Sequence, residues 1–167
     1  MTLRRAQVAD AEAIAGIAVR TWWHSHQDFV SPQALAERTV ETQTPRWVAR
    51  LQDPELEVWV AEAGGRVVGY AAFGASADPD AAPLTGALGA LYVDPPAQGA
   101  GLGTRLHGHA VARLLERGFE QATLWTFEEN RQARAFYEGR GWELDTGAAG
   151  NEPEPWEEPA VRYRLEL

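Results

Sequence analysis

VDPPAQGAGLGTRL, residues 93–106, joins an apolar run to an amphipathic segment and decides how the chain folds around it. Two prolines and three glycines predict a sharp bend. Apolar residues then recur at helical spacing from Leu102 onward, which predicts a helix, and Gly118 is the expected end of that helix. The first N–H groups of a helix lack internal partners, and glycine lets a ligand come close to the backbone. The turn therefore indicates an anion site, while a plain strand-to-helix turn explains the same glycines equally well.

This turn does not fit either of two common nucleotide-binding loops. A dinucleotide fingerprint needs glycine where Thr104 stands, and no early βαβ unit carries it. A Walker loop needs a lysine, and all 15 cationic side chains of the chain are arginines. If the turn binds phosphate, it belongs to another class of site.

Composition limits the domain count and excludes several chemistries. The 167 residues predict one globular domain, and 45% hydrophobic with 23% charged residues are normal for a soluble protein. Without cysteine or lysine, the chain offers no thiolate, disulfide, cysteine metal site or Schiff base. The three serines stand outside a G-x-S-x-G motif, which argues against serine hydrolysis.

Charge and hydropathy limit the partners. No apolar run approaches the length of a membrane span and the N-terminus shows no clear cleavage site, so a cytoplasmic protein without membrane contact is expected. The net charge of −9 and the scattered arginines argue against nucleic acid. The acidity favours cationic or neutral partners, or it simply keeps the protein soluble.

The hydrophobic pattern predicts a mixed sheet with helices on its faces. Capping signals predict a helix from Ala11 to Trp23 that Asp10 caps, and two short helices that begin at Ser31-Pro32 and Thr44-Pro45. A helix capped by Asn130 is also expected. The expected strands are Thr2 to Arg5, a run from Glu57, a run from Arg66 after a Gly64-Gly65 hairpin, Thr85 to Val93, ATLWTF at 122–127, a short run from Trp142, and VRYRLEL at 161–167.

Two motifs make the chain resemble the GNAT superfamily of N-acetyltransferases. Residues 98–103, QGAGLG, read as the acyl-CoA-binding signature Q/R-x-x-G-x-G/A, and residues 129–142, ENRQARAFYEGRGW, read as N-x-x-A-x-x-F-Y followed by a G-aromatic pair. The resemblance implies that residues 1–167 form a single N-acetyltransferase domain. It also implies an α/β fold with a mixed, mostly antiparallel central sheet of about six to seven strands flanked by about four helices.

The resemblance further implies acetyl-CoA as the donor, and no metal is expected. The backbone of residues 91–93 would pair with the pantetheine arm as an extra strand does, and the amides of residues 98–104 would hold the pyrophosphate. Asn130 would contact the CoA arm, and the alternative is a plain helix cap. The expected cofactor-binding residues are Leu91, Tyr92, Val93, Gln98, Gly99, Ala100, Gly101, Leu102, Gly103, Thr104, Asn130, Ala133 and Phe136.

Tyr137 is the catalytic residue that the resemblance implies. In this family the amine attacks the thioester directly, so a phenol would donate a proton to the departing thiolate, while a backbone amide of residues 91–93 meets the oxyanion. The alternative is an aromatic ring that only packs beside Phe136. The candidates for the general base stay open: they are Glu62, Asp94, His24 and His26.

The sequence says least about the acceptor substrate. Four aromatic residues lie in helices that wall the acceptor site in this family, namely Trp22, Trp23, Trp47 and Phe29. Acidic residues crowd the last loop, namely Glu152, Glu154, Glu157 and Glu158. Together they suit a cationic acceptor, although core tryptophans and a solvated loop explain them as well.

The expected function is transfer of an acetyl group from acetyl-CoA to the amine of a small molecule or peptide, without a covalent enzyme intermediate. The alternative is a non-catalytic acyl-CoA-binding or sensing module on the same fold, against which the presence of Tyr137 argues. An unrelated interaction domain would need both motifs to be coincidences. The acceptor, the base, a longer acyl donor and the oligomeric state, for which a homodimer is one option, stay open.

Overall fold

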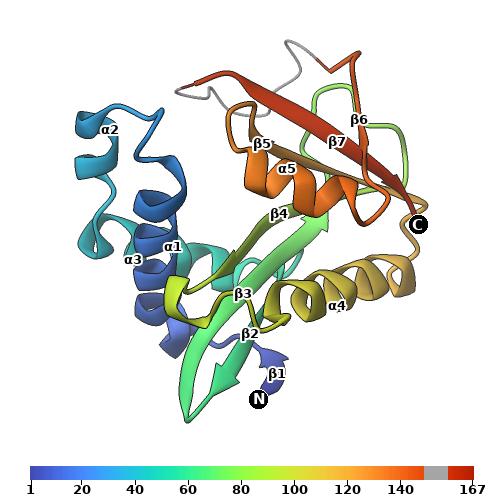
Figure 1. Ribbon diagram of the computed structural model, residues 1–167. Helices are drawn as coiled ribbons and strands as arrows, with labels where there is room; N and C mark the ends of the chain where they lie inside the picture. Colours follow the sequence, from blue (N-terminus) through green and yellow to red (C-terminus); the bar gives the residue numbers. More distant parts are fainter. Residues whose placement is uncertain (149–157) are drawn as a thin grey trace.

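The computed structural model describes residues 1–148 and 158–167, and one seven-stranded sheet forms its centre (Figure 1). The strand order is β1-β2-β3-β4-β5-β7-β6, and every neighbouring pair is antiparallel except β4 and β5. The predicted mixed, mostly antiparallel sheet is therefore confirmed. The strands are β1 (Thr2–Arg5), β2 (Glu57–Ala63), β3 (Arg66–Ala75), β4 (Thr85–Val93), β5 (Gln121–Phe127), β6 (Glu143–Leu144) and β7 (Ala160–Glu166).

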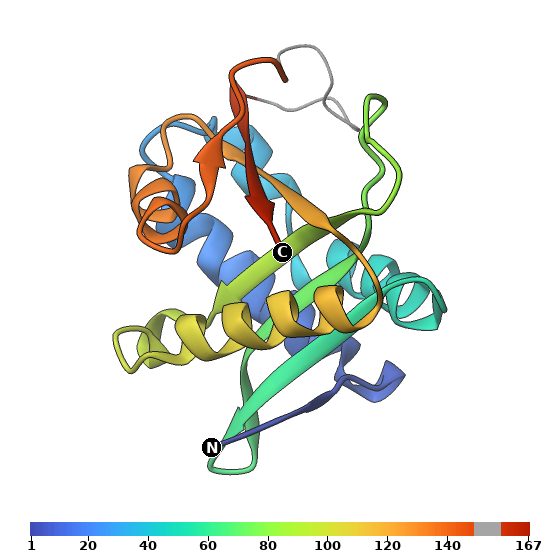
Figure 2. The same ribbon diagram turned by 90° about the vertical axis from the view of Figure 1, so that its right-hand side faces the viewer.

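Helices cover both faces of this sheet. Along β3, Tyr70 and Ala72 belong to the core under α1 and α3, whereas Ala71 and Phe73 belong to the core under α4. Figure 2 shows α4 in front of the sheet and α1 behind it. The helices are α1 (Ala11–His26), α2 (Pro32–Glu37), α3 (Val40–Gln52), α4 (Leu102–Glu116) and α5 (Arg131–Glu138).

Helix α1 begins at Ala11 as predicted, but the role of Asp10 at this start and the start of α3 differ from the sequence prediction. Asp10 does not cap α1, because its carboxylate accepts hydrogen bonds from the Arg4 guanidinium at 2.8 Å and from a backbone N–H of the preceding turn at 2.7 Å. α3 begins before Thr44, since Thr39 and Thr42 form a reciprocal capping box that satisfies first-turn groups. Pro45 consequently lies inside the helix and does not start it.

Other local predictions are confirmed. Ser31 caps α2 by accepting the N–H of Ala34 at 3.2 Å, and Asn130 caps α5 by accepting the N–H of Ala133 at 3.1 Å. The Gly64-Gly65 hairpin joins β2 and β3 with φ angles of 58° and 72°, which glycine adopts without strain. Caps and tight turns depend on adjacent residues, so the sequence pattern identifies them directly.

The sheet opens between β4 and β5. Their parallel ladder pairs only residues 85–87 with residues 121–123. Opposite β3, Gly89 is an extra residue between Leu88 and Ala90, and such a bulge bends and twists a strand. In the described ranges, the edge of β4 that faces β5 therefore has no partner strand from Leu88 to Val93.

The neutral side chain of His107 holds α4 against the chain near β6. The Trp142 indole N–H donates to Nε2 of His107 at 2.8 Å, and both side chains are buried. Burial and, to a smaller extent, the charge of Arg140 lower the pKa of His107 from 6.5 to about 4. The folded protein thus favours neutral His107.

We expect the free energy of unfolding to fall between pH 6.5 and pH 4. A histidine whose pKa is lower in the folded state binds more protons when unfolded, so its contribution is complete above pH 6.5 and decreases with acidification. For His107 the loss at pH 5 should be about 2 kcal/mol. Urea unfolding at pH 7.5 and pH 5 measures it, and His107→Gln, whose amide oxygen can still accept from Trp142, should show a smaller difference. An equal difference in this variant would contradict the assignment.

Candidate functional site

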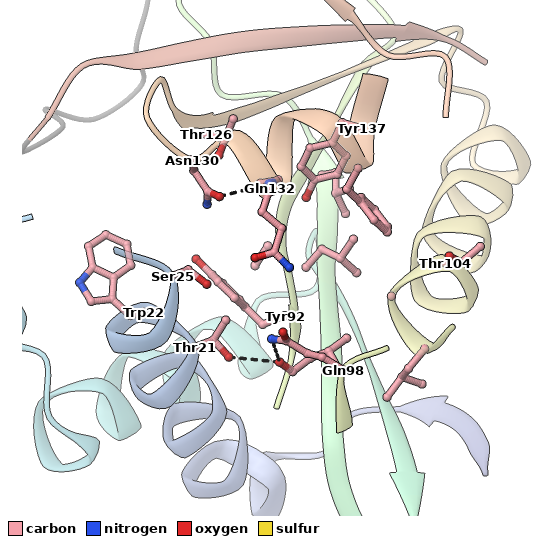
Figure 3. A pocket seen from close by; sticks show the side chains of 18 of the residues that line it. Thr21, Trp22, Ser25, Tyr92, Gln98, Thr104, Thr126, Asn130, Gln132 and Tyr137 are labelled. Carbon is pink, nitrogen blue, oxygen red and sulfur yellow. Dashed lines mark hydrogen bonds between the residues drawn. The ribbon is translucent and has the colours of Figure 1, made fainter. Parts of the chain in front are cut away.

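A cavity of about 410 Å³ lies where β4 and β5 separate, and α1, the start of α4, and α5 complete its walls (Figure 3). Ala100 is exposed in the turn before α4 and does not border the cavity. The other predicted site residues line it, namely Leu91, Tyr92, Val93, Gln98, Gly99, Gly101, Leu102, Gly103, Thr104, Asn130, Ala133, Phe136 and Tyr137. The fold thus brings both sequence motifs to one place.

The free edge of β4 forms one wall. The N–H of Asp94 donates to Val68 of β3 at 2.9 Å, so the alternation of an extended strand turns the backbone groups of Leu91 and Val93 toward the cavity. The backbone of Tyr92 faces β3 instead, and its side chain lines the cavity. The backbone N–H groups of Leu91 and Val93 are therefore the donors that this edge offers.

The carbonyl of Val93 is already engaged. The side-chain amide of Gln98 donates to it at 3.0 Å and the hydroxyl of Thr21 donates at 3.3 Å (Figure 3). These bonds tie the end of β4 to the glycine turn and to α1. They also turn the Gln98 side chain toward the protein backbone.

The glycine turn leaves open space at the start of α4. Gly99 and Gly101 have φ angles of 81° and 76°, and a Cβ atom at either position would meet no atom within 4 Å. Gly101 is the N-cap of α4, so the amides of residues 102–104 have no carbonyl acceptor within the helix. Open space next to unpaired amides at a helix N-terminus can hold an anion such as phosphate.

Tyr137 packs its ring against other aromatic side chains and also faces the cavity. Its ring packs against Phe136 and Trp142 at centroid distances of 5.3 and 5.9 Å, while its phenol oxygen points into the cavity (Figure 3). Burial raises the pKa of this phenol above its usual value of 10.0. The hydroxyl is therefore protonated at neutral pH and can donate a proton within the cavity.

His26 is the histidine that lines the cavity. Its Nδ1 lies 2.9 Å from the carbonyl of Trp22, which can only accept, so Nδ1 carries the proton. Nε2 then faces the amide nitrogen of Asn130 at 3.4 Å. Burial lowers the pKa of His26 from 6.5 to about 4, so the ring is neutral and a weak base.

The other candidates for a base lie elsewhere. Glu62 accepts from Arg4 at 2.8 Å and Asp94 accepts from Arg20 at 2.8 Å, while His24 is exposed. None of these three side chains borders the cavity, nor does any other carboxylate of residues 1–148 and 158–167.

The predicted acceptor walls separate into different environments. Trp22 lines the cavity, but Trp23 is exposed and Trp47 is buried against Tyr70. Phe29 packs behind the wall against His26. Glu152, Glu154 and Glu157 lie outside the described residues, and Glu158 is half-buried ahead of β7.

Several lining residues were missed by the sequence analysis. Trp125 borders the cavity with its indole N–H held by Asp78 at 2.7 Å, and the Gln132 side chain points into it (Figure 3). The others are Thr21, Ser25, Leu88, Gly89, Ala90, Thr126, Phe127 and Arg140. Gln132 and Arg140 lie within the second motif, so their place in that segment was the available signal.

None of the helices of residues 1–148 and 158–167 has both the length and the apolar composition to cross a membrane. In the same ranges, no three histidine or acidic side chains are grouped so that they could hold a metal ion.

Comparison with known proteins gives consistent results. A model of the acetyltransferase (GNAT) family matches residues 14–142. YhfO of Bacillus subtilis, named as an uncharacterized N-acetyltransferase, is 30% identical over 149 residues, which cover 88% of this chain and 93% of YhfO. A Mycobacterium tuberculosis protein named as a probable N-acetyltransferase is 30% identical over 154 residues, which cover 86% of this chain and 80% of that protein.

Solved structures share the fold. The PaiA N-acetyltransferase of Thermoplasma acidophilum, solved in complex with coenzyme A, has a TM-score of 0.78 with 15% identity, covering 99% of this chain and 98% of its own. Salmonella typhimurium yncA, solved with its cofactor acetyl-CoA, has a TM-score of 0.71 with 24% identity, covering 100% and 94%. The similarity therefore includes the whole sheet and its helices.

Proposed function

Because this chain belongs to the GNAT family of N-acetyltransferases, we propose that residues 1–167 act as one domain that moves an acetyl group from acetyl-CoA directly to an amine. The observation that carries this proposal is one cavity that combines three features. They are the unpaired edge of β4, the open glycine turn at the start of α4, and the protonated phenol of Tyr137.

The residues of the cavity suit coenzyme A. A pantetheine arm can accept hydrogen bonds from the free backbone N–H groups of Leu91 and Val93, as an added strand would. The open space beside Gly99 and Gly101 admits a diphosphate next to the first amides of α4. Residues of α5 form the facing wall, namely Asn130, Ala133 and Phe136.

The cavity residues then divide the work of acyl transfer. When bound, acetyl-CoA supplies an acetyl group activated as a thioester. A backbone N–H of Leu91 or Val93 donates to the carbonyl oxygen as negative charge develops there, and Tyr137 gives its proton to the departing sulfur. The chain has no cysteine that could form an acetyl-thioester intermediate, which supports direct attack by the amine on acetyl-CoA.

The amine loses its proton without help from a strong base. No carboxylate of the described residues lines the cavity, and the lowered pKa of His26, about 4, makes its ring a poor proton acceptor at pH 7. We therefore propose that the acceptor reacts in its unprotonated form or loses a proton to water. A cationic acceptor, favoured by the acidic residues of the last loop, would be deprotonated in this way.

Release of the CoA thiol over a panel of amines and peptide N-termini tests this function. We expect acceptor-dependent release, with kcat/KM rising with pH toward the pKa of the amine. A plateau near pH 6 with every amine would contradict the absence of a basic enzyme group. Binding of acetyl-CoA without release with any acceptor would instead support a sensing module, and preference for a longer acyl thioester would change the donor.

A further inference from the structure

Arg140 is exceptional among the residues that line the cavity. It is the one lining side chain in the described ranges that carries a formal charge at neutral pH, because the pKa of His26 is lowered to about 4. The whole chain has a net charge of −9, which opposes the approach of an anion. Arg140 is therefore the one lining side chain of the described ranges that can attract an anion into the cavity by its charge.

Its neighbours hold the guanidinium beside the first turn of α4. Nη1 donates to the carbonyl of Phe136 at 2.7 Å, Nη2 donates to the hydroxyl of Thr104 at 2.5 Å, and the group stacks 3.6 Å from the centroid of the Phe136 ring. These contacts fix a flexible side chain in one place.

The guanidinium keeps unused donors. Arg20 and Arg162, which do not line the cavity, each meet a carboxylate, whereas no carboxylate of residues 1–148 and 158–167 pairs with Arg140. Five N–H donors are available on an arginine, and the two bonds to Phe136 and Thr104 leave at least one on each terminal nitrogen. The Thr104 hydroxyl accepts from Arg140, so its own proton can be donated elsewhere.

The acyl-CoA signature allows arginine at the position of Gln98, but the neutral Gln98 side chain here donates to the carbonyl of Val93. The charge that this position could supply is thus missing from the turn. Arg140 approaches the same turn from the end of α5.

We propose that Arg140, together with the Thr104 hydroxyl, binds the diphosphate of coenzyme A beside the first amides of α4. This inference rests on the proposed function, because it assigns a further residue to the same cofactor site. Charged hydrogen bonds to phosphate are stronger than neutral ones, and Arg140 also offsets the net negative charge of the chain at the place where the anion binds.

Three probes and two matched variants test the proposal by calorimetry. The probes are CoA, 3′-dephospho-CoA, and pantetheine, which lacks phosphate. Arg140→Gln removes the charge at the cavity. Arg131→Gln is the control, because this substitution removes the same charge from the first turn of α5, where the Arg131 side chain is 88% exposed. We expect Arg140→Gln to weaken CoA and 3′-dephospho-CoA alike by about 10-fold or more, with a weaker salt dependence, and to leave pantetheine unchanged. Arg131→Gln should resemble the parent.

The other possible results of these titrations contradict the proposal or change the role of Arg140. Unchanged affinity overturns the proposal, a loss for CoA alone moves Arg140 to the 3′-phosphate, and an equal loss for pantetheine shows a packing defect. If Arg140→Gln does not fold, Thr104→Val in its exposed position replaces it, and unchanged CoA affinity there also overturns the proposal. A parent protein that fails to bind CoA refutes the proposed function and this inference with it.

Discussion

Gly103→Glu should abolish measurable CoA binding while the protein stays folded. Gly103 is the second residue of α4, and a Cβ atom there would lie 3.5 Å from the Phe136 ring, an ordinary contact. A carboxylate in the first turn of a helix interacts favourably with the helix dipole, so no loss of stability is expected. The same carboxylate would repel phosphate: two unit charges about 4 Å apart interact by about 4 kcal/mol near a protein surface, or roughly 10³-fold in affinity.

Gly108→Glu is the matched control. It adds the same charge to the same helix, where a Cβ atom would meet nothing within 4 Å, and its affinity for CoA should stay close to that of the parent. Gly101 is less suitable, because its φ of 76° makes any side chain strained. Titration calorimetry and thermal unfolding of both variants measure the two effects. Parent-like CoA binding by Gly103→Glu would remove the diphosphate from the start of α4.

Adjacent residues explain why the glycine turn was predictable. A helix start, its unpaired amides and the glycines before it are set within about one turn of chain, so their chemistry is readable from the sequence. The start of α3 shows the limit of this reasoning. Thr44-Pro45 and the Thr39–Thr42 box are both valid start signals, and the sequence does not state which one prevails.

Contacts between distant segments explain what the sequence did not indicate. Glu62 and Asp94 were reasonable bases until Arg4 and Arg20, far away in the chain, were found to hold them outside the cavity. Arg140 reaches the start of α4 only because α4 and α5 meet near the opened sheet. No spacing rule encodes the separation of β4 and β5 that brings these groups together.

Tyr137→Phe should lower turnover by about 10²-fold or more while acetyl-CoA affinity stays nearly unchanged. The structure gives the Tyr137 hydroxyl no hydrogen-bond partner among the residues it describes, so its removal breaks no bond in the folded protein, and the ring still packs against Phe136 and Trp142. Because burial raises the pKa of the phenol above 10.0, the parent should keep its acid throughout the neutral range. Single-turnover measurements, in which product release does not limit the rate, test this directly.

Tyr92→Phe separates proton donation from a general effect of losing a phenol in the cavity. Tyr92 is the other lining tyrosine, and burial raises its pKa as well, but it stands on β4 across the cavity from α5. If Tyr137 is the acid, Tyr92→Phe retains most of the turnover and the double variant behaves like Tyr137→Phe alone. If Tyr137→Phe stays within about threefold of the parent and only the double variant is slow, either phenol can reach the sulfur. If the double variant is also fast, the proton comes from water, and Tyr137 serves the site only through the packing of its ring.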